Sequence, residues 1–236
     1  NCPTRFGWED KDLLIWKAVL GSKAYGGPPV ATGKIFVGTN NQRPRNERDV
    51  HRGKNGQVEP IDRGVLMCFD EKTGKFLWQK TYKKLEAGRV VDWPGEGICS
   101  SPTVEGDKVY YVSNRCELVC ADVKDGNTIW KLDMIKDLGV FPHNLSVCSP
   151  LIVGDDIFLI TANGVDEGHA KWLHRRALWT LRRRMPTWTR HHVEETGEGW
   201  LTRVATEVHW DTDFPGLGRW PQGGWWRKKG RGTARV

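Results

Sequence analysis

The chain has 236 residues, 38% of them hydrophobic and 28% charged, a composition typical of a globular protein long enough to bury a core. No stretch approaches the roughly 18 apolar residues of a membrane-spanning helix, so that class is excluded. The net charge of +7 is an average over two unlike segments, because residues 1–168 carry 22 basic and 23 acidic residues whereas residues 169–236 carry 14 and 6.

The first strands are predicted near the start of the chain. The segment Leu13-Leu14-Ile15-Trp16 is interpreted as the end of an earlier, incomplete unit. A short strand after Pro29 then ends at a tight turn containing Gly33, and the β-branched and aromatic residues 34–37 predict a second strand. Residues 41–63 are rich in Asn, Arg, Asp and Gly and are predicted to form a long exposed loop, of the kind that carries binding function.

The next two strands are predicted from a sequence motif that occurs twice. Residues 66–78 read LMCFDEKTGKFLW and residues 118–130 read LVCADVKDGNTIW, with Leu, Cys, Asp, Lys, Gly and Trp in the same register. The offset of 52 residues is close to the length of a four-stranded propeller blade. The upstream Pro-x-x-x-Gly element occurs three times, at Pro29 to Gly33, Pro102 to Gly106 and Pro150 to Gly154.

Six residues form the structural signature of this motif: Asp70, Gly74, Trp78, Asp122, Gly126 and Trp130. We expect each Asp to cap backbone amides in a turn and each Gly to permit a positive φ. Each Trp is expected to end the fourth strand and to fill the wedge between neighbouring blades. The sequence therefore predicts an all-β fold, a partial β-propeller of four-stranded antiparallel blades with two to three blades present, followed by an irregular basic C-terminal segment.

Two segments are predicted, namely propeller blades over residues 1–168 and an Arg/Trp-rich tail over residues 169–236. Basic clusters interleaved with Trp favour nucleic-acid binding when taken alone. The alternative hypothesis is that the tail is out of frame or disordered, because repeat character stops near Gly168 and Arg, Trp and Gly have G-rich codons. On that hypothesis nucleic acid is not an expected partner.

The residues with chemical potential form no convincing site. The six cysteines make no C-x-x-C pair, which argues against a zinc knuckle, and they are interpreted as small buried hydrophobes or structural disulfides of open connectivity. The seven histidines show no metal-ligand spacing, and Asp155-Asp156 occupy the turn of the third unit rather than a calcium site. We therefore predict no catalytic residue and no metal ligand, and leave cofactor-binding residues unassigned.

The segments Asp70 to Trp78 and Asp122 to Trp130 resemble the repeat of the pyrroloquinoline-quinone-like propellers. The resemblance covers about residues 13–168. Two classes share this repeat. Quinoprotein dehydrogenases hold pyrroloquinoline quinone and calcium on the propeller axis, whereas non-enzymatic propellers include the lipoprotein of the outer-membrane assembly machinery. The six signature residues imply architecture in both classes.

The resemblance implies a non-catalytic binding or scaffold module of the cell envelope, periplasmic or secreted. The alternative is a fragment of a quinone-dependent alcohol or sugar dehydrogenase, so enzymatic activity is left open. Pyrroloquinoline quinone and calcium are expected as cofactors only in that case. The adjacent-cysteine pair found in many such enzymes does not occur here. Expected partners are other proteins, bound through a blade face or loops, together with the missing blades or further copies of the chain, because an incomplete propeller exposes faces and strand edges.

Overall fold

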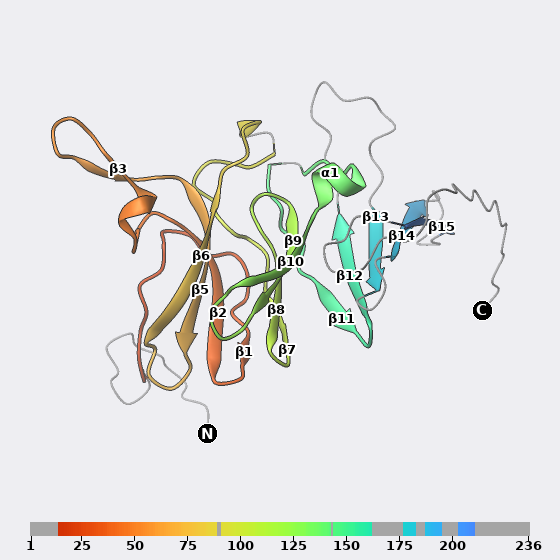
Figure 1. The fold of residues 1–236 in the computed structure, drawn as a ribbon, viewed down its shortest axis with the longest axis horizontal. Helices are drawn as coiled ribbons and strands as arrows, with labels where there is room; N and C mark the ends of the chain where they lie inside the picture. The colour runs from red at the N-terminus through yellow and green to blue at the C-terminus, as the bar shows by residue number, and fades with distance from the viewer. Residues whose placement is uncertain are drawn as a thin grey trace, which may run out of the picture.

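The computed structural model describes residues 14–88, 91–142, 144–161, 177–182, 187–194 and 203–210. These residues form a partial β-propeller, in which three antiparallel sheets stand side by side in chain order (Figure 1). The predicted fold class is confirmed. No helix in the described ranges is long and apolar enough to cross a membrane.

The first sheet contains the first complete repeat unit. Its order is β1-β2-β5-β6, formed by β1 (Val30–Ala31), β2 (Lys34–Asn40), β5 (Arg63–Asp70) and β6 (Phe76–Lys83). Gly33 has a φ of 72° and forms the tight turn between β1 and β2, as the Pro-x-x-x-Gly element predicts. The blade is therefore a simple antiparallel sheet with one insertion between its second and third strands.

The second sheet repeats this plan. Its strands are β7 (Thr103–Glu105), β8 (Lys108–Val112), β9 (Glu117–Asp122) and β10 (Thr128–Asp133), in the order β10-β9-β8-β7. A short helix follows, α1 (Met134–Leu138), which is capped by the side chain of Asp133 and ends at Gly139 with a φ of 65°.

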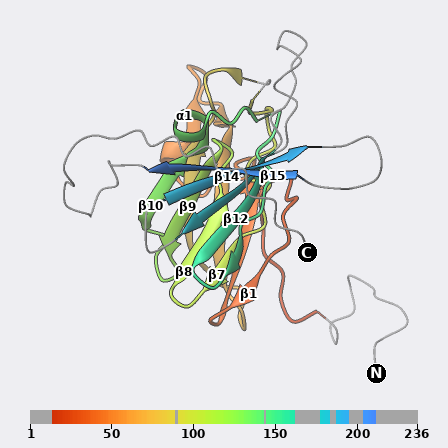
Figure 2. The same ribbon diagram turned by 90° about the vertical axis from the view of Figure 1, so that its right-hand side faces the viewer.

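The third sheet has five strands, one more than the four-stranded repeat predicts. Its strands are β11 (Leu151–Val153), β12 (Asp156–Thr161), β13 (Ala177–Arg182), β14 (Thr187–Glu194) and β15 (Arg203–Trp210), paired in that order. Figure 2 looks onto this end of the molecule. The segment expected to be irregular from residue 169 therefore contains three strands. The proposed boundary near Gly168 lies outside the described residues.

The insertion is more ordered than the predicted long exposed loop. It contains η1 (Glu47–Asp49) and a two-stranded hairpin, β3 (Val50–Arg52) with β4 (Val58–Pro60). At its base the buried Asn41 amide donates to the carbonyls of Asp49 and Ile61, at 2.8 Å each. These two bonds hold the ends of the insertion together and leave the hairpin projecting from the first blade (Figure 1).

The fourth strands continue past the signature tryptophans, contrary to the expectation that they end there. Trp78 is the third residue of β6 and Trp130 the third of β10. A register shift just before each Trp leaves Leu77 and Ile129 without a cross-strand partner. These are β-bulges, and they occupy equivalent positions in the two repeats.

The core lies between the sheets. One cluster joins the first two blades and is built on Phe36, Leu66, Trp78, Val109 and Tyr111. A second joins the second and third blades. A third covers the other face of the first sheet, where Ala18 and Leu20 of the N-terminal segment pack. Burial between blades is thus the main source of cohesion, because each sheet has apolar residues on both faces.

Candidate functional site

Two tryptophans connect one repeat unit to the next. The indole Nε1 of Trp78 donates to the carbonyl oxygen of Val123 at 3.1 Å. In the same way, the indole Nε1 of Trp16 donates to the carbonyl oxygen of Glu71 at 2.8 Å. The two acceptors follow Asp122 and Asp70 directly, so the contact repeats with the sequence. Trp16 lies outside the strands but acts as the tryptophan of an earlier unit would.

Each signature glycine lies against the ring of one of these tryptophans. Gly74 and Gly126 have φ values of 67° and 72°. A Cβ at Gly126 would lie 2.6 Å from the ring of Trp78, and one at Gly74 would lie 2.5 Å from the ring of Trp16. Both positive φ and the close approach of a ring therefore require glycine.

The signature aspartates stabilise the turns. Asp70 Oδ1 accepts from the hydroxyl and the backbone N–H of Thr73, at 2.7 and 2.8 Å, and these bonds lower the pKa of Asp70. Asp122 Oδ1 accepts from the backbone N–H of Lys124 at 2.7 Å. Trp130 packs on Tyr110 with ring centroids 6.0 Å apart. The six signature residues are thus spread over two turns and the four strands that flank them, β5, β6, β9 and β10, and are not gathered at one site.

Buried carboxylates occur in the connection between the first two blades, but each is held by a cation. Asp92 pairs with Lys84 and accepts from the Asn114 amide at 2.8 Å. Glu96 pairs with Lys23. Burial opposes ionisation of Glu96, but the hydrogen bonds from Lys23 and Tyr25 outweigh it, so its pKa is lowered. These groups stabilise the connection as paired charges.

Within the residues that the structure describes, no three His, Cys, Asp or Glu side chains come together in a way that could hold a metal ion. Asp155 lies in the turn between β11 and β12, as predicted from the repeat, whereas Asp156, predicted in the same turn, is the first residue of β12. His51 lies exposed in β3, His191 and His192 are neighbours in β14, and His143 lies outside the described residues.

The described cysteines are free thiols within or beside the core. Cys68, Cys99, Cys116 and Cys120 are buried and Cys148 is half-buried. Burial raises the pKa of Cys68 and Cys116 to about 12. Of the two interpretations of the cysteines, small buried hydrophobes is the one that these residues support.

A recess that could receive a ligand lies between the outer strands of the first two blades. We call it the outer groove and define it by the residues that line it: Lys80, Thr81, Tyr82, Thr128, Ile129, Trp130 and Lys131. It has a volume of about 500 Å³ and is open to solvent. Its walls are β6 and β10, the outermost strands of the two sheets.

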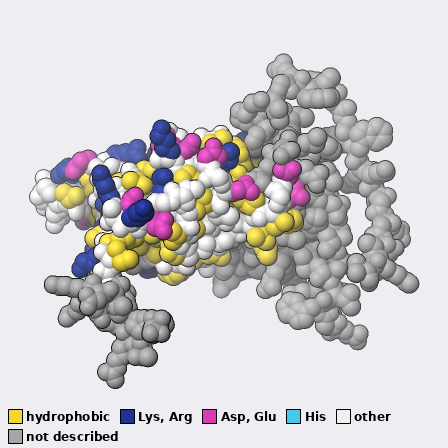
Figure 3. Space-filling view, turned by 90° about the horizontal axis from the view of Figure 1, so that it is seen from below, with side chains coloured by type: hydrophobic (Ala, Val, Ile, Leu, Met, Phe, Trp, Pro, Cys, Tyr) yellow, Lys and Arg dark blue, Asp and Glu magenta, His cyan; other side chains and the backbone are white. Residues whose placement is uncertain are grey.

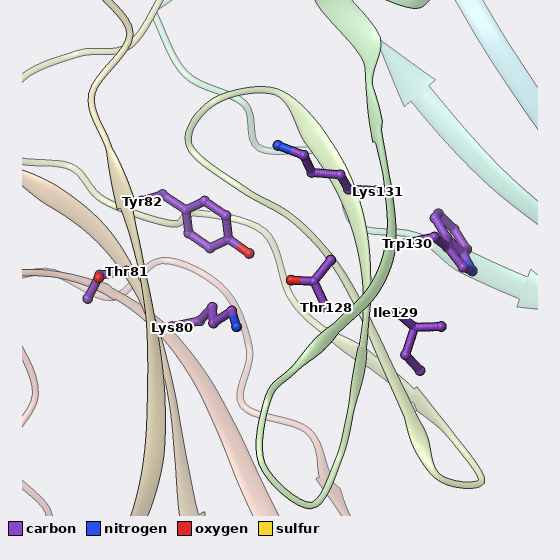
Figure 4. A pocket seen from close by; sticks show the side chains of 7 residues that line it. All are labelled: Lys80, Thr81, Tyr82, Thr128, Ile129, Trp130 and Lys131. Atoms are coloured by element: carbon purple, nitrogen blue, oxygen red, sulfur yellow. The ribbon is translucent and has the colours of Figure 1, made fainter. Parts of the chain in front are cut away.

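The outer groove combines apolar surface with the polar ends of several side chains. Figure 4 shows Lys80 and Tyr82 projecting from β6 towards Thr128 and Lys131 of β10. Ile129 and Trp130 project from the other side of β10. The groove therefore presents two ammonium groups and two hydroxyl groups between its walls.

Neighbouring groups fix the charge of the outer groove. The hydroxyl of Tyr82, whose pKa burial raises to about 12, lies 2.5 Å from the hydroxyl of Tyr111 and adds no charge near pH 7. Lys131 Nζ donates to Glu117 Oε1 at 2.7 Å, while more than half of the Lys131 side chain is exposed. Lys80 forms no ion pair with any described residue. The groove therefore carries a positive charge that the described residues do not cancel.

Comparison with known proteins identifies the repeat. The family model for the outer membrane protein assembly factor BamB matches residues 9–174. The chain belongs to this family. No curated protein matches the chain.

Solved structures also resemble this member of the family. They include the quinohemoprotein alcohol dehydrogenase of Comamonas testosteroni, at 14% identity over 72% of this chain and 21% of that one, with a TM-score of 0.49. A second such enzyme, ADHIIG from Pseudomonas putida HK5, matches at 16% identity over 77% of this chain and 24% of that one, with a TM-score of 0.45. BamB from Moraxella catarrhalis matches at 15% identity over 71% of this chain and 46% of that one, with a TM-score of 0.36. The chain therefore spans between about a fifth and a half of the length of these proteins.

Sequence reasoning did not find the outer groove. Its residues belong to two units and become neighbours only because adjacent blades pack side by side. The usable signal was the repeat offset, which places residues 76–83 and 128–133 on equivalent outer strands. A lysine occurs in both, at Lys80 and Lys131, among residues with hydroxyl groups.

Proposed function

We propose that this chain is a non-catalytic binding module of the cell envelope, and that it binds another polypeptide in the outer groove. The observation that supports the proposal is the groove itself, an open recess with unneutralised positive charge between two outer strands. Family membership supports a protein-binding role, because the name of the family describes an assembly factor.

The other features of the described residues indicate structural roles rather than catalytic ones. The signature residues stabilise turns and connect blades, as the bonds of Trp78 and Asp70 show. The buried carboxylates Asp92 and Glu96 are paired with lysines. On the surface, apolar, basic and acidic side chains are interspersed at the end seen in Figure 3, which is a composition suited to protein contacts.

Photo-crosslinking from the wall of the outer groove tests this proposal. Thr128 is exposed and projects into the outer groove (Figure 4), whereas Leu77, in the bulge of β6, is 39% exposed and does not line the groove. A photoreactive phenylalanine analogue would replace each residue in the full chain, which would then be mixed with envelope proteins of the organism that encodes it. We expect a crosslinked product from position 128, competed by excess unmodified chain, and none from position 77. Equal products at both positions, or none at either, would contradict the proposal.

A second measurement distinguishes this function from that of a quinone-dependent dehydrogenase. The full chain would be mixed with pyrroloquinoline quinone and calcium, and both quinone absorbance and dye reduction with alcohols and sugars would be followed. A binding module leaves the dye oxidised. Retained quinone together with dye reduction would replace the proposed function with the enzymatic one.

A further inference from the structure

We infer that the outer groove recognises an extended, acidic segment of polypeptide, with its carboxylates at Lys80 and Lys131. This inference rests on the proposed function and specifies the chemistry of the partner.

The charge of the groove selects for carboxylates. Lys80 has no ion-pair partner among the described residues, and Lys131 shares one carboxylate, that of Glu117, with the more distant Arg115. An ammonium group has three donors, so Lys131 retains donors beyond its bond to Glu117. Strand β6 carries Lys80 and Lys83 and no acidic residue. An acidic ligand would therefore gain charge-assisted hydrogen bonds, whereas a basic ligand would meet like charges.

Hydroxyl groups add acceptor and donor capacity at the same place. Tyr82 and Thr128 lie between the two lysines in the groove (Figure 4). Because the hydroxyl of Tyr82 stays protonated, it can take part as a neutral donor or acceptor. The two ammonium groups suit carboxylates, which accept charge-assisted hydrogen bonds from them, while the apolar surface of the groove can contact the side chains between those carboxylates.

The form of the ligand follows from the walls of the groove. Both β6 and β10 are edge strands in their sheets, and an edge strand presents a row of backbone N–H and C=O groups to an extended chain. The third sheet shows that an outer edge in this molecule accepts such a chain. There β15 adds to β14 as a fifth strand, with an antiparallel register from Thr187↔Trp210 to Glu194↔Arg203. An extended segment lying along β10 in the outer groove would use the same geometry.

Short synthetic peptides test the inference with the full chain. One peptide alternates Glu and Val, a second alternates Gln and Val, and a third alternates Lys and Val; free glutamate is the small-carboxylate probe. Binding would be measured by fluorescence anisotropy of the labelled peptides, with glutamate as competitor. We expect the Glu peptide to bind at least about tenfold more tightly than the other two, and free glutamate not to displace it.

Substitutions locate the binding to the groove. Lys80→Glu is expected to weaken binding of the Glu peptide by about tenfold and to strengthen binding of the Lys peptide, since it reverses one charge. Lys131→Gln, which keeps an amide donor beside Glu117, is the second variant and should weaken binding less. The matched controls are Lys72→Glu and Lys124→Glu, which change exposed lysines in the two signature turns and should leave affinity unchanged.

The outcomes separate this inference from the function on which it rests. Equal affinity for all three peptides, loss of binding in the turn controls, or displacement by free glutamate would each overturn the inference. If the crosslink from position 128 forms while the peptides show no preference for acid, the proposed binding module is supported and the acidic preference is refuted. If both the crosslink and peptide binding fail, both proposals fall.

Discussion

The indole of Trp78, on the fourth strand of the first blade, donates its N–H to the carbonyl of Val123 in the second blade at 3.1 Å and lies against Gly126. The side chain is almost fully buried and belongs to the cluster that joins the two blades. One residue thus combines apolar burial with a directional bond across the blade interface.

The contact between Trp78 and Gly126 predicts that Gly126→Ala is strongly destabilising. The added methyl group would sit 2.6 Å from the ring, at a backbone φ of 72°. Strain at positive φ and overpacking together should lower the free energy of unfolding by about 2 to 4 kcal/mol. The midpoint of urea unfolding measures this.

Gly106→Ala is the matched control for that substitution. Gly106 has a φ of 59°, but a Cβ there would meet nothing within 4 Å. Only the conformational cost applies, so we expect a loss of about 1 kcal/mol. Equal losses at positions 106 and 126 would show that the ring contact contributes nothing.

Trp78→Phe tests the hydrogen bond and the volume of the indole. The variant keeps an aromatic ring but leaves the Val123 carbonyl without its donor and creates a small cavity. We expect the free energy of unfolding to fall by about 2 to 3 kcal/mol. Leu77→Ala, at the neighbouring exposed bulge, should change it by less than about 0.5 kcal/mol. A urea midpoint unchanged by Trp78→Phe would refute this account of the interface.

The buried thiols predict a loss of stability at alkaline pH. The pKa of Cys68 and Cys116 is raised to about 12 in the folded chain, and that of Cys99 and Cys120 to about 11, against an ordinary value of 9.0. Between these values the unfolded chain has lost thiol protons that the folded chain still holds, so folding becomes less favourable as pH rises. The urea midpoint should therefore fall above about pH 9. It should fall less steeply in Cys68→Ala, and a midpoint equal at pH 7 and pH 10 would disprove the effect.

The base of the insertion predicts a proteolytic phenotype for Asn41→Ala. Removing the amide takes away two bonds, to the carbonyls of Asp49 and Ile61. The hairpin should then open more often, and trypsin should cleave faster at the exposed Lys54. Gln42→Ala, which changes an exposed neighbour, is the control and should be cleaved at the original rate.

Much of the fold could be predicted because each repeat contains residues that mark its turns. Gly33, Gly106 and Gly154 each mark the turn between the first two strands of a blade, and all three have positive φ. The insertion was located correctly, but its hairpin was missed because residues 50–60 show no strong strand pattern. The strands β13 to β15 were missed for another reason. They pair through backbone hydrogen bonds, which need no repeat signature.

The outer groove shows where sequence reasoning ends. Lys80 and Lys131 are unremarkable surface residues in the sequence, and each would be read as the solvated side of a strand. Their meaning depends on the packing of two blades, which brings together positions about 50 residues apart. A repeat predicts the strands of each blade but not the recess between them.

The tryptophan contacts also impose an order of events during synthesis. Trp16 reaches an acceptor 55 residues further along the chain, and Trp78 one 45 residues further along. Each indole thus leaves the ribosome well before the carbonyl that will hold it, and its blade stays unclosed until the following blade has emerged. Blade closure would therefore trail translation by about one repeat, and a ribosome that paused between Trp78 and Val123 would leave the first blade with its largest apolar side chain exposed.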